Sequence, residues 1–143
     1  MQNRFIDLYS DTKTKPSAGM RKAMADAEVG DEQKLEDPTV NRLRERICEL
    51  LGKEDAVFLP SGTMANQIAI RVHCRPGDEV ITDRTAHIIT SEGGGPAANA
   101  SVMIRPLDGP KGVFTGEQVK AAIRDPNIRY VARQRLVSIE NTS

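Results

Sequence analysis

Three short polar segments carry the side chains that could bind an anion or move a proton. The first is Ser61-Gly62-Thr63, which lies between an apolar stretch and a helical pattern. A helix start presents unpaired backbone N–H groups and a partial positive charge, Gly62 allows a ligand to approach closely, and the two hydroxyls add donors. This segment could hold a phosphate group, or its Ser and Thr could serve only as helix caps.

His87 is the second candidate, because it follows Thr82-Asp83 at the end of an expected strand. A neutral imidazole there could stack on a flat heterocycle or transfer a proton near neutral pH. It could equally be an ordinary loop or core histidine. Glu92 lies further along the same segment and could orient the ring, or could be a solvated carboxylate.

The third candidate is the polar segment 10–16, which begins with Ser10 and gathers hydroxyls, a carboxylate and two ammonium groups. An extended arm of this kind can reach into a cleft and hydrogen-bond a small substrate. Polar termini are, however, usually only solvated. The segment by itself therefore leaves both interpretations open.

The elements that must position these side chains alternate between strands and helices. In chain order, the expected elements are a strand at 56–59, a helix at 63–73, strands at 79–82 and 101–107, a helix at 115–124 and a strand at 136–140. This alternation favours a mainly parallel sheet with helices on both faces. Ligands of such sheets bind at the carboxyl ends of the strands. The residues at those ends include 60–63, 83–87 and 141–143.

Two helices are expected before this alternation begins. The first starts near Ser17, carries an apolar stripe and ends at Gly30. The second starts at Asp37-Pro38, an N-cap followed by a first-turn proline, and Gly52 stops it.

The composition excludes several classes of protein. Hydrophobic residues make up 38% and charged residues 28% of the chain, which is too apolar for a disordered protein and too polar for a membrane protein. Twenty Lys and Arg balance twenty Asp and Glu, so no long-range field attracts nucleic acid or an anionic membrane. The start of the chain has no apolar leader, so we expect a cytoplasmic protein. Cys48 and Cys74 lack metal-ligand spacing, and we expect no metal site.

Five segments in a shared order resemble the amino-terminal half of the threonine aldolases, which belong to the beta-eliminating lyase group. They are IDLYSDTKTKPS at 6–17, EVGDEQKLEDPTV at 28–40, FLPSGTMANQ at 58–67, AHI at 86–88 and SIENT at 138–142. The resemblance implies an α/β fold, in which the chain forms part of the mainly parallel large-domain sheet of a fold-type-I pyridoxal-phosphate (PLP) enzyme. An N-terminal arm and helices would precede that sheet.

The resemblance also implies a reaction and roles for particular residues. The expected cofactor is PLP, and the expected reaction is cleavage of threonine, allo-threonine or another β-hydroxy-α-amino acid to glycine and an aldehyde. In the family, the segment matching Ser61-Gly62-Thr63 holds the cofactor phosphate, and the histidine matching His87 stacks on the pyridine ring near the substrate hydroxyl. The serine matching Ser10 binds the substrate carboxylate. Arg129 stands where some relatives have a histidine near the substrate aldehyde.

The family's cofactor-binding lysine and the aspartate that pairs with the pyridine nitrogen lie beyond the SIENT segment and have no counterpart in this sequence. We therefore assign residues 1–38 to an arm and first helix and residues 39–143 to an incomplete PLP-binding large domain, and we expect this chain alone to be inactive. Fold-type-I clefts form at dimer interfaces, which implies a homodimer or homotetramer for the full-length enzyme. Two alternatives remain: another fold-type-I PLP lyase, acting by β-elimination or similar to serine hydroxymethyltransferase, and an inactive dimerising fragment.

Overall fold

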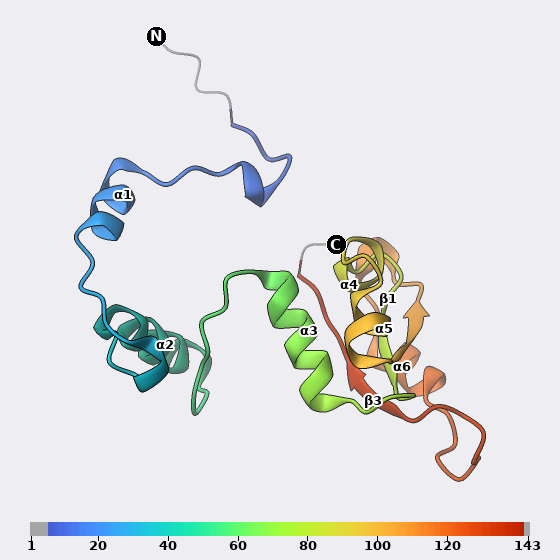
Figure 1. Ribbon diagram of the computed structural model, residues 1–143. Coiled ribbons are helices and arrows are strands. Elements are labelled where there is room, and N and C mark those ends of the chain that lie inside the picture. The colour runs from blue at the N-terminus through green and yellow to red at the C-terminus, as the bar shows by residue number, and fades with distance from the viewer. Residues whose placement is uncertain (1–5, 142–143) are drawn as a thin grey trace. The chain divides into compact units, whose positions relative to one another are not determined.

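The computed structural model describes residues 6–141 (Figure 1). The chain divides into two compact units, Met1–Phe58 and Leu59–Ser143. The functional division expected at residue 38 is not tested by these units and stays a prediction. No helix in the described range is long and apolar enough to cross a membrane.

The first unit consists of short helices. They are η1 (Asp11–Lys13), α1 (Ala18–Ala25), η2 (Glu32–Lys34) and α2 (Pro38–Leu51). The Ser17 hydroxyl caps α1 by accepting the Met20 N–H, which confirms the expected start of that helix. The helix ends at Ala25 instead of Gly30. It buries none of its residues, and a short helix without a packed face has little to hold its last turn.

Helix α2 follows the expected capping chemistry at both ends. The Asp37 carboxylate accepts the N–H groups of Thr39 at 3.0 Å and Val40 at 2.9 Å, and Pro38 occupies the first turn. Gly52 ends the helix with a φ of 62°, a left-handed conformation that glycine adopts without strain. The predicted bounds of this helix are therefore confirmed.

The second unit is an α/β structure around a parallel sheet. In chain order its elements are α3 (Gly62–His73), β1 (Glu79–Asp83), α4 (His87–Thr90), α5 (Gly95–Ala100), β2 (Met103–Leu107), η3 (Pro110–Gly112), α6 (Gly116–Ala122) and β3 (Gln134–Val137). The strand order is β2-β1-β3, and β1 pairs in parallel with both neighbours. The expected parallel α/β sheet is confirmed. The central strand is β1, so its carboxyl end lies in the middle of the functional edge.

Two local expectations differ from the structure. The strand expected at 56–59 is wrong: that stretch is irregular, and no described strand pairs with it to supply the hydrogen bonds that a strand needs. The glycine-rich stretch 93–96 lies outside every element expected above, but Gly95 begins α5 with Pro96 in its first turn.

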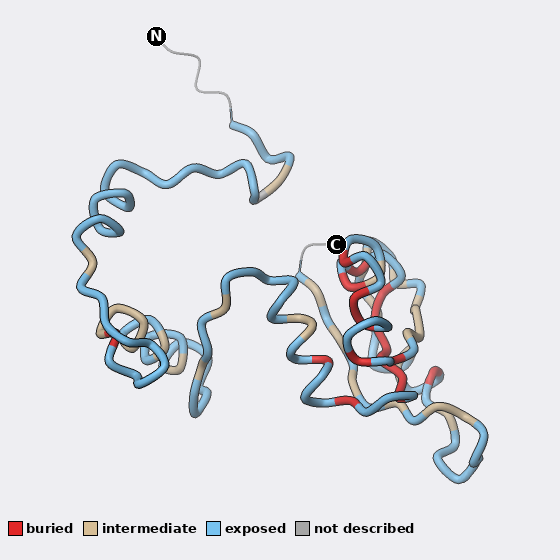
Figure 2. The backbone as a smooth tube through the Cα atoms, viewed as in Figure 1, coloured by how far each residue is buried: buried red, intermediate tan, exposed pale blue. Residues whose placement is uncertain are grey.

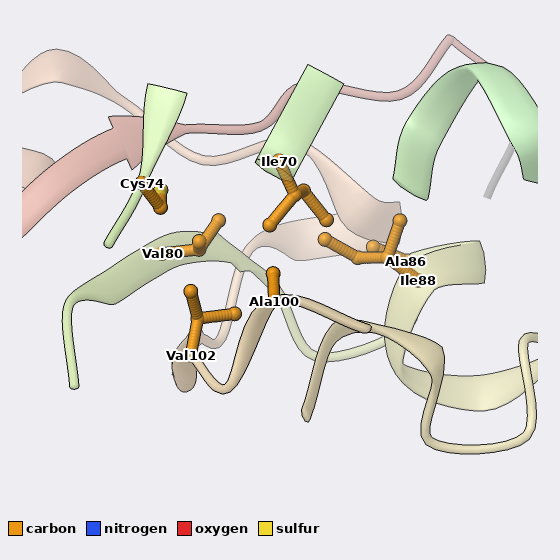
Figure 3. Close-up of a cluster of buried hydrophobic side chains, with 7 residues drawn as sticks. All are labelled: Ile70, Cys74, Val80, Ala86, Ile88, Ala100 and Val102. Atoms are coloured by element: carbon orange, nitrogen blue, oxygen red, sulfur yellow. The ribbon is translucent and has the colours of Figure 1, made fainter. Parts of the chain in front are cut away.

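The core of the second unit lies where α3 packs on β1. Every residue of β1 is buried, as the red segment in Figure 2 shows. In Figure 3, Ile70 of α3 and Cys74, which follows that helix, lie in one cluster with Val80 of β1. The other members of this cluster are Ala86, Ile88, Ala100 and Val102. Since α4 and α5 both contribute side chains, the core fixes the segments that follow β1 against the carboxyl-terminal half of α3.

Candidate functional site

The turn before α3 presents a set of hydrogen-bond donors. Ser61 is the N-cap, and its hydroxyl accepts the Met64 N–H at 3.1 Å. The N–H groups of Gly62 and Thr63 belong to the first turn, where a helix provides no acceptor for them. All three residues of this α3 corner are exposed, and a Cβ built on Gly62 meets no atom within 4 Å. The corner therefore has donors, a helix-dipole charge and room for an anion such as a phosphate.

The imidazole of His87 lies at the carboxyl edge of the sheet. His87 begins α4 directly after the turn that follows β1, and its backbone N–H donates to the Glu140 carboxylate at 2.6 Å. The Nδ1 atom lies 2.9 Å from Glu92 Oε1. About half of the side chain remains exposed, at 46%. The ring is thus anchored on one side and open on the other.

Glu92 is not the solvated carboxylate that the sequence left possible. Its side chain is 0% exposed, and it accepts hydrogen bonds from Asn66 at 2.7 Å and from Gln67. Burial opposes ionisation of the group, but the hydrogen bonds from Asn66, His87 and Gln67 outweigh it and lower the pKa of Glu92 below 4.5. We call Asn66, Gln67, His87 and Glu92 the Glu92 cluster. It contains a buried negative charge at neutral pH.

Helix α3 links the corner to the Glu92 cluster. Asn66 lies about one helical turn after Gly62, and a turn rises about 5.4 Å along the axis. The same helix therefore supplies both the anion-binding donors and the amides that hold Glu92. A cavity of about 240 Å³ lies beside the cluster, with Asn66, Ile88 and Ser138 among its lining residues. Hydrogen bonds from Asn66 to Glu92 and between Glu92 and His87 thus connect the imidazole to α3 about one turn after the corner.

Ser10 belongs to the first unit. Its hydroxyl lies 2.8 Å from that of Thr12, and Lys13 forms an ion pair with Asp7 at 2.6 Å. These contacts shape the arm around η1. The role expected for Ser10 toward a substrate carboxylate stays a prediction.

Arg129 precedes the amino end of β3, whereas His87 follows the carboxyl end of the parallel strand β1. Arg129 is an exposed residue in the loop between α6 and β3, and that loop leads to the amino end of β3. It lines a cavity of about 520 Å³ together with Arg124 and Arg133. The structure therefore does not bring Arg129 and His87 into one site. The substrate contact expected for Arg129 stays a prediction.

The beta-eliminating lyase family model matches residues 7–143. The chain belongs to the beta-eliminating lyase family. Among curated members, it is 44% identical over 138 residues to the low specificity L-threonine aldolase of Escherichia coli K12, covering 96% of this chain and 41% of that protein. It is 42% identical over 145 residues to low-specificity L-threonine aldolase 1 of Arabidopsis thaliana, covering 99% of this chain and 40% of that protein.

The fold comparison agrees with this membership. A solved structure of the Leishmania major threonine aldolase matches with a TM-score of 0.61 and 29% identity, covering 73% of this chain and 31% of that one. The chain therefore has part of the α/β fold of the fold-type-I enzymes. The chain spans about two fifths of the length of the curated relatives named above.

The sequence patterns pointed to His87, to the corner and to Glu92, but not to three residues that contact His87 and Glu92: Asn66, Gln67 and Glu140. Asn66 and Gln67 follow the corner within the quoted segment 58–67, and Glu140 lies in the quoted segment 138–142. Their presence in these segments was the available signal. Their contacts with residues 87 and 92 cross 25 or more positions, which no local pattern reveals.

Proposed function

We propose that this lyase uses PLP to cleave β-hydroxy-α-amino acids such as threonine and allo-threonine to glycine and an aldehyde. The observation that carries the proposal is that α3 has an exposed N-terminus and, one turn later, an amide that holds the buried carboxylate partner of a half-exposed imidazole. The names of the relatives favour the aldolase reaction over β-elimination or hydroxymethyl transfer. The proposed site thus combines an anion-binding helix N-terminus, the α3 corner, with a proton acceptor, the His87 imidazole.

The residues of the α3 corner fit a phosphate group. The Gly62 and Thr63 amides and the Ser61 and Thr63 hydroxyls are the donors that would hold it, and the open space at Gly62 admits the bound oxygens. Bound PLP supplies the electron-withdrawing ring that makes the Cα–Cβ bond of an amino acid breakable. The hydrogen bonds from Asn66 to Glu92 and between Glu92 and His87 support a position for His87 beside a ring held at the corner.

His87 is the proposed base. Its Nε2 has no hydrogen-bond partner within residues 6–141, and the exposed side of the ring can meet a substrate hydroxyl. The lone pair of Nε2 takes the β-hydroxyl proton, and the imidazole becomes a cation that the Glu92 carboxylate stabilises. Removal of this proton drives the separation of the aldehyde carbon from the α-carbon. Positioned acid–base groups of this kind typically contribute about 10²–10⁴-fold to a rate.

The cofactor site is tested by binding of pyridoxine 5′-phosphate, which lacks the aldehyde and so forms no covalent bond with lysine. We expect it to bind the 143-residue chain at least about tenfold more tightly than pyridoxine, because one charge-assisted hydrogen bond contributes roughly 1.5–3 kcal/mol. Ser61→Ala should weaken this binding several-fold. Thr115→Ala is the matched control, since it also removes an N-cap hydroxyl but on α6. Equal affinity for both ligands, or equal effects of the two substitutions, would contradict the site.

The reaction is tested in a hybrid protein made with a full-length relative. Residues 1–143 replace the aligned part of the Escherichia coli L-threonine aldolase, and release of acetaldehyde from threonine is measured. We expect the hybrid to retain cleavage and His87→Asn in the hybrid to lose about 10²-fold or more of kcat. A folded hybrid that binds PLP but leaves threonine intact would refute the aldolase assignment.

A further inference from the structure

The Glu92 cluster determines which nitrogen of His87 carries the proton. An ionised carboxylate only accepts hydrogen bonds, so every polar neighbour of Glu92 must direct a donor toward it. Asn66 and Gln67 do so through their side-chain NH₂ groups. The Gln67 carbonyl oxygen is in turn engaged by Asn99 Nδ2 at 3.2 Å, which fixes the orientation of the Gln67 amide.

The same requirement applies to the imidazole. With Glu92 Oε1 at 2.9 Å as an acceptor, Nδ1 must be the protonated nitrogen. A neutral imidazole has only one N–H group, so Nε2 then carries the lone pair. The buried carboxylate faces Nδ1, and the exposed side of the ring faces away from it.

The close packing of α5 on α3 completes the arrangement. A Cβ on Gly95 would lie 2.6 Å from Gln67 Nε2, so glycine at this position lets the Gln67 amide reach Glu92. The Glu140 carboxylate holds the backbone N–H of His87 from the other side. The ring is therefore held by its backbone and by one nitrogen, while the second nitrogen is left for the reaction.

We propose that Glu92 is a positioning residue that fixes His87 as the Nδ1–H tautomer and so turns the Nε2 lone pair toward the substrate hydroxyl. The proposal deepens the function proposed above and rests on His87 acting as the base there. Asn66 and Gln67 support it by keeping the buried Glu92 side chain hydrogen-bonded on both oxygens.

The test is ¹⁵N NMR of the two histidine rings in the 143-residue chain at about pH 9, above the usual range of imidazole titration. We expect at least about a tenfold preference for Nδ1–H at His87, since a hydrogen bond to a charged group contributes roughly 1.5–3 kcal/mol. Exposed His73 on α3 serves as the reference within the same sample and should show no such preference. A proton found mainly on Nε2 of His87 overturns the proposal, whatever any variant does.

Glu92→Gln should reduce the preference at His87 by about tenfold, because a carboxamide has a single acceptor oxygen for three donors. Glu117→Gln is the matched control, since it makes the same chemical change at an exposed site on α6. A folded Glu92→Gln chain with an unchanged ratio would show a merely structural role for Glu92 and overturn the proposal. If this variant does not fold, the tautomer of His87 measured in the unsubstituted chain decides the proposal.

The pyridoxine 5′-phosphate measurement separates the two proposals. Binding of that ligand together with a proton on Nε2 refutes the role of Glu92 and leaves the cofactor site standing. If His87 is the Nδ1–H tautomer but the chain shows no phosphate-dependent binding, the proposed function is refuted. The catalytic role of the His87–Glu92 pair is then refuted with it.

Discussion

Asp83, the last residue of β1, joins two loops at the functional edge of the sheet. Its carboxylate accepts the Thr85 N–H at 2.9 Å and the Thr85 hydroxyl at 2.7 Å, which fixes the turn leading to His87. The second oxygen accepts the Gly109 N–H at 2.9 Å from the loop after β2. Hydrogen bonds from the Thr85 backbone and side chain, followed by the Gly109 amide, lower the pKa of Asp83. The turn before His87 is thus held by a buried, ionised side chain.

Gly109 is required at this junction because a larger side chain has no space there. A Cβ there would lie 2.5 Å from the Val113 carbonyl and 2.8 Å from Asp83 Oδ2. We expect Gly109→Ala to lower the free energy of unfolding by about 1–3 kcal/mol, because backbone atoms must move to admit the methyl group. Urea denaturation measures this.

Gly116→Ala is the matched control for that substitution. A Cβ on Gly116 meets no atom within 4 Å, and the residue lies in the first turn of α6. Because alanine favours helix more than glycine does, we expect this change to be neutral or stabilising by up to about 1 kcal/mol. Similar losses in both variants would show that the crowding at Gly109 is not the cause.

At the scale of elements, helix α6 shows how capping connects the sheet to its covering helix. The Thr115 hydroxyl accepts the Gln118 N–H at 3.3 Å, and Gln118 Oε1 accepts the Thr115 N–H at 2.8 Å. The Gln118 amide also donates to the Asp108 carbonyl at 3.1 Å, just after β2. This capping box therefore fixes the start of α6 against the end of a strand.

Thr115→Ala removes the hydroxyl of that box, and we expect the free energy of unfolding to fall by about 1 kcal/mol. Thr115→Ser keeps the oxygen and should retain most of the stability. The loss should appear in urea denaturation, with the affinity for pyridoxine 5′-phosphate unchanged. An unaltered midpoint for Thr115→Ala would mean that the cap contributes nothing to the second unit.

At the scale of the whole second unit, the buried carboxylates make the free energy of unfolding depend on pH. The pKa of Glu92 lies below 4.5 and that of Asp83 below 3.8 in the folded chain. Their contribution is complete above those values, because the unfolded chain then gains no extra protons. As the pH falls below about 4.5, the unfolded chain binds protons first and the contribution of Glu92 is lost.

We expect the urea midpoint of the second unit to fall steadily below about pH 4.5. The NMR signals of the Val80 and Ile81 amides, both buried in β1, report on this unit alone. Glu92→Gln cannot titrate at this position, so its midpoint should be lower at neutral pH but fall less steeply in acid. Parallel curves for the two chains would contradict the ionised state of Glu92.

The sequence by itself determined the features that depend on local chemistry. Capping and periodicity predicted the start of α2 at Pro38, its end before Gly52 and the strand-helix alternation of the second unit, because each follows from hydrogen bonds and spacing within a few residues. The position of His87 after an expected strand also predicted that it would lie at the carboxyl edge of the sheet. The proposed cofactor and reaction came from the family resemblance.

Only the tertiary structure decided which partners these residues have. That Glu92 is buried and binds Nδ1 of His87 depends on the packing of α3 and α5 around it, and its amide donors are 25 and 26 positions away in the chain. The irregular stretch at 56–59 and the location of Arg129 likewise depend on which segments pair or pack with each other in the folded chain. Local patterns fix hydrogen bonds within a turn, whereas burial and long-range pairing are properties of the packed chain.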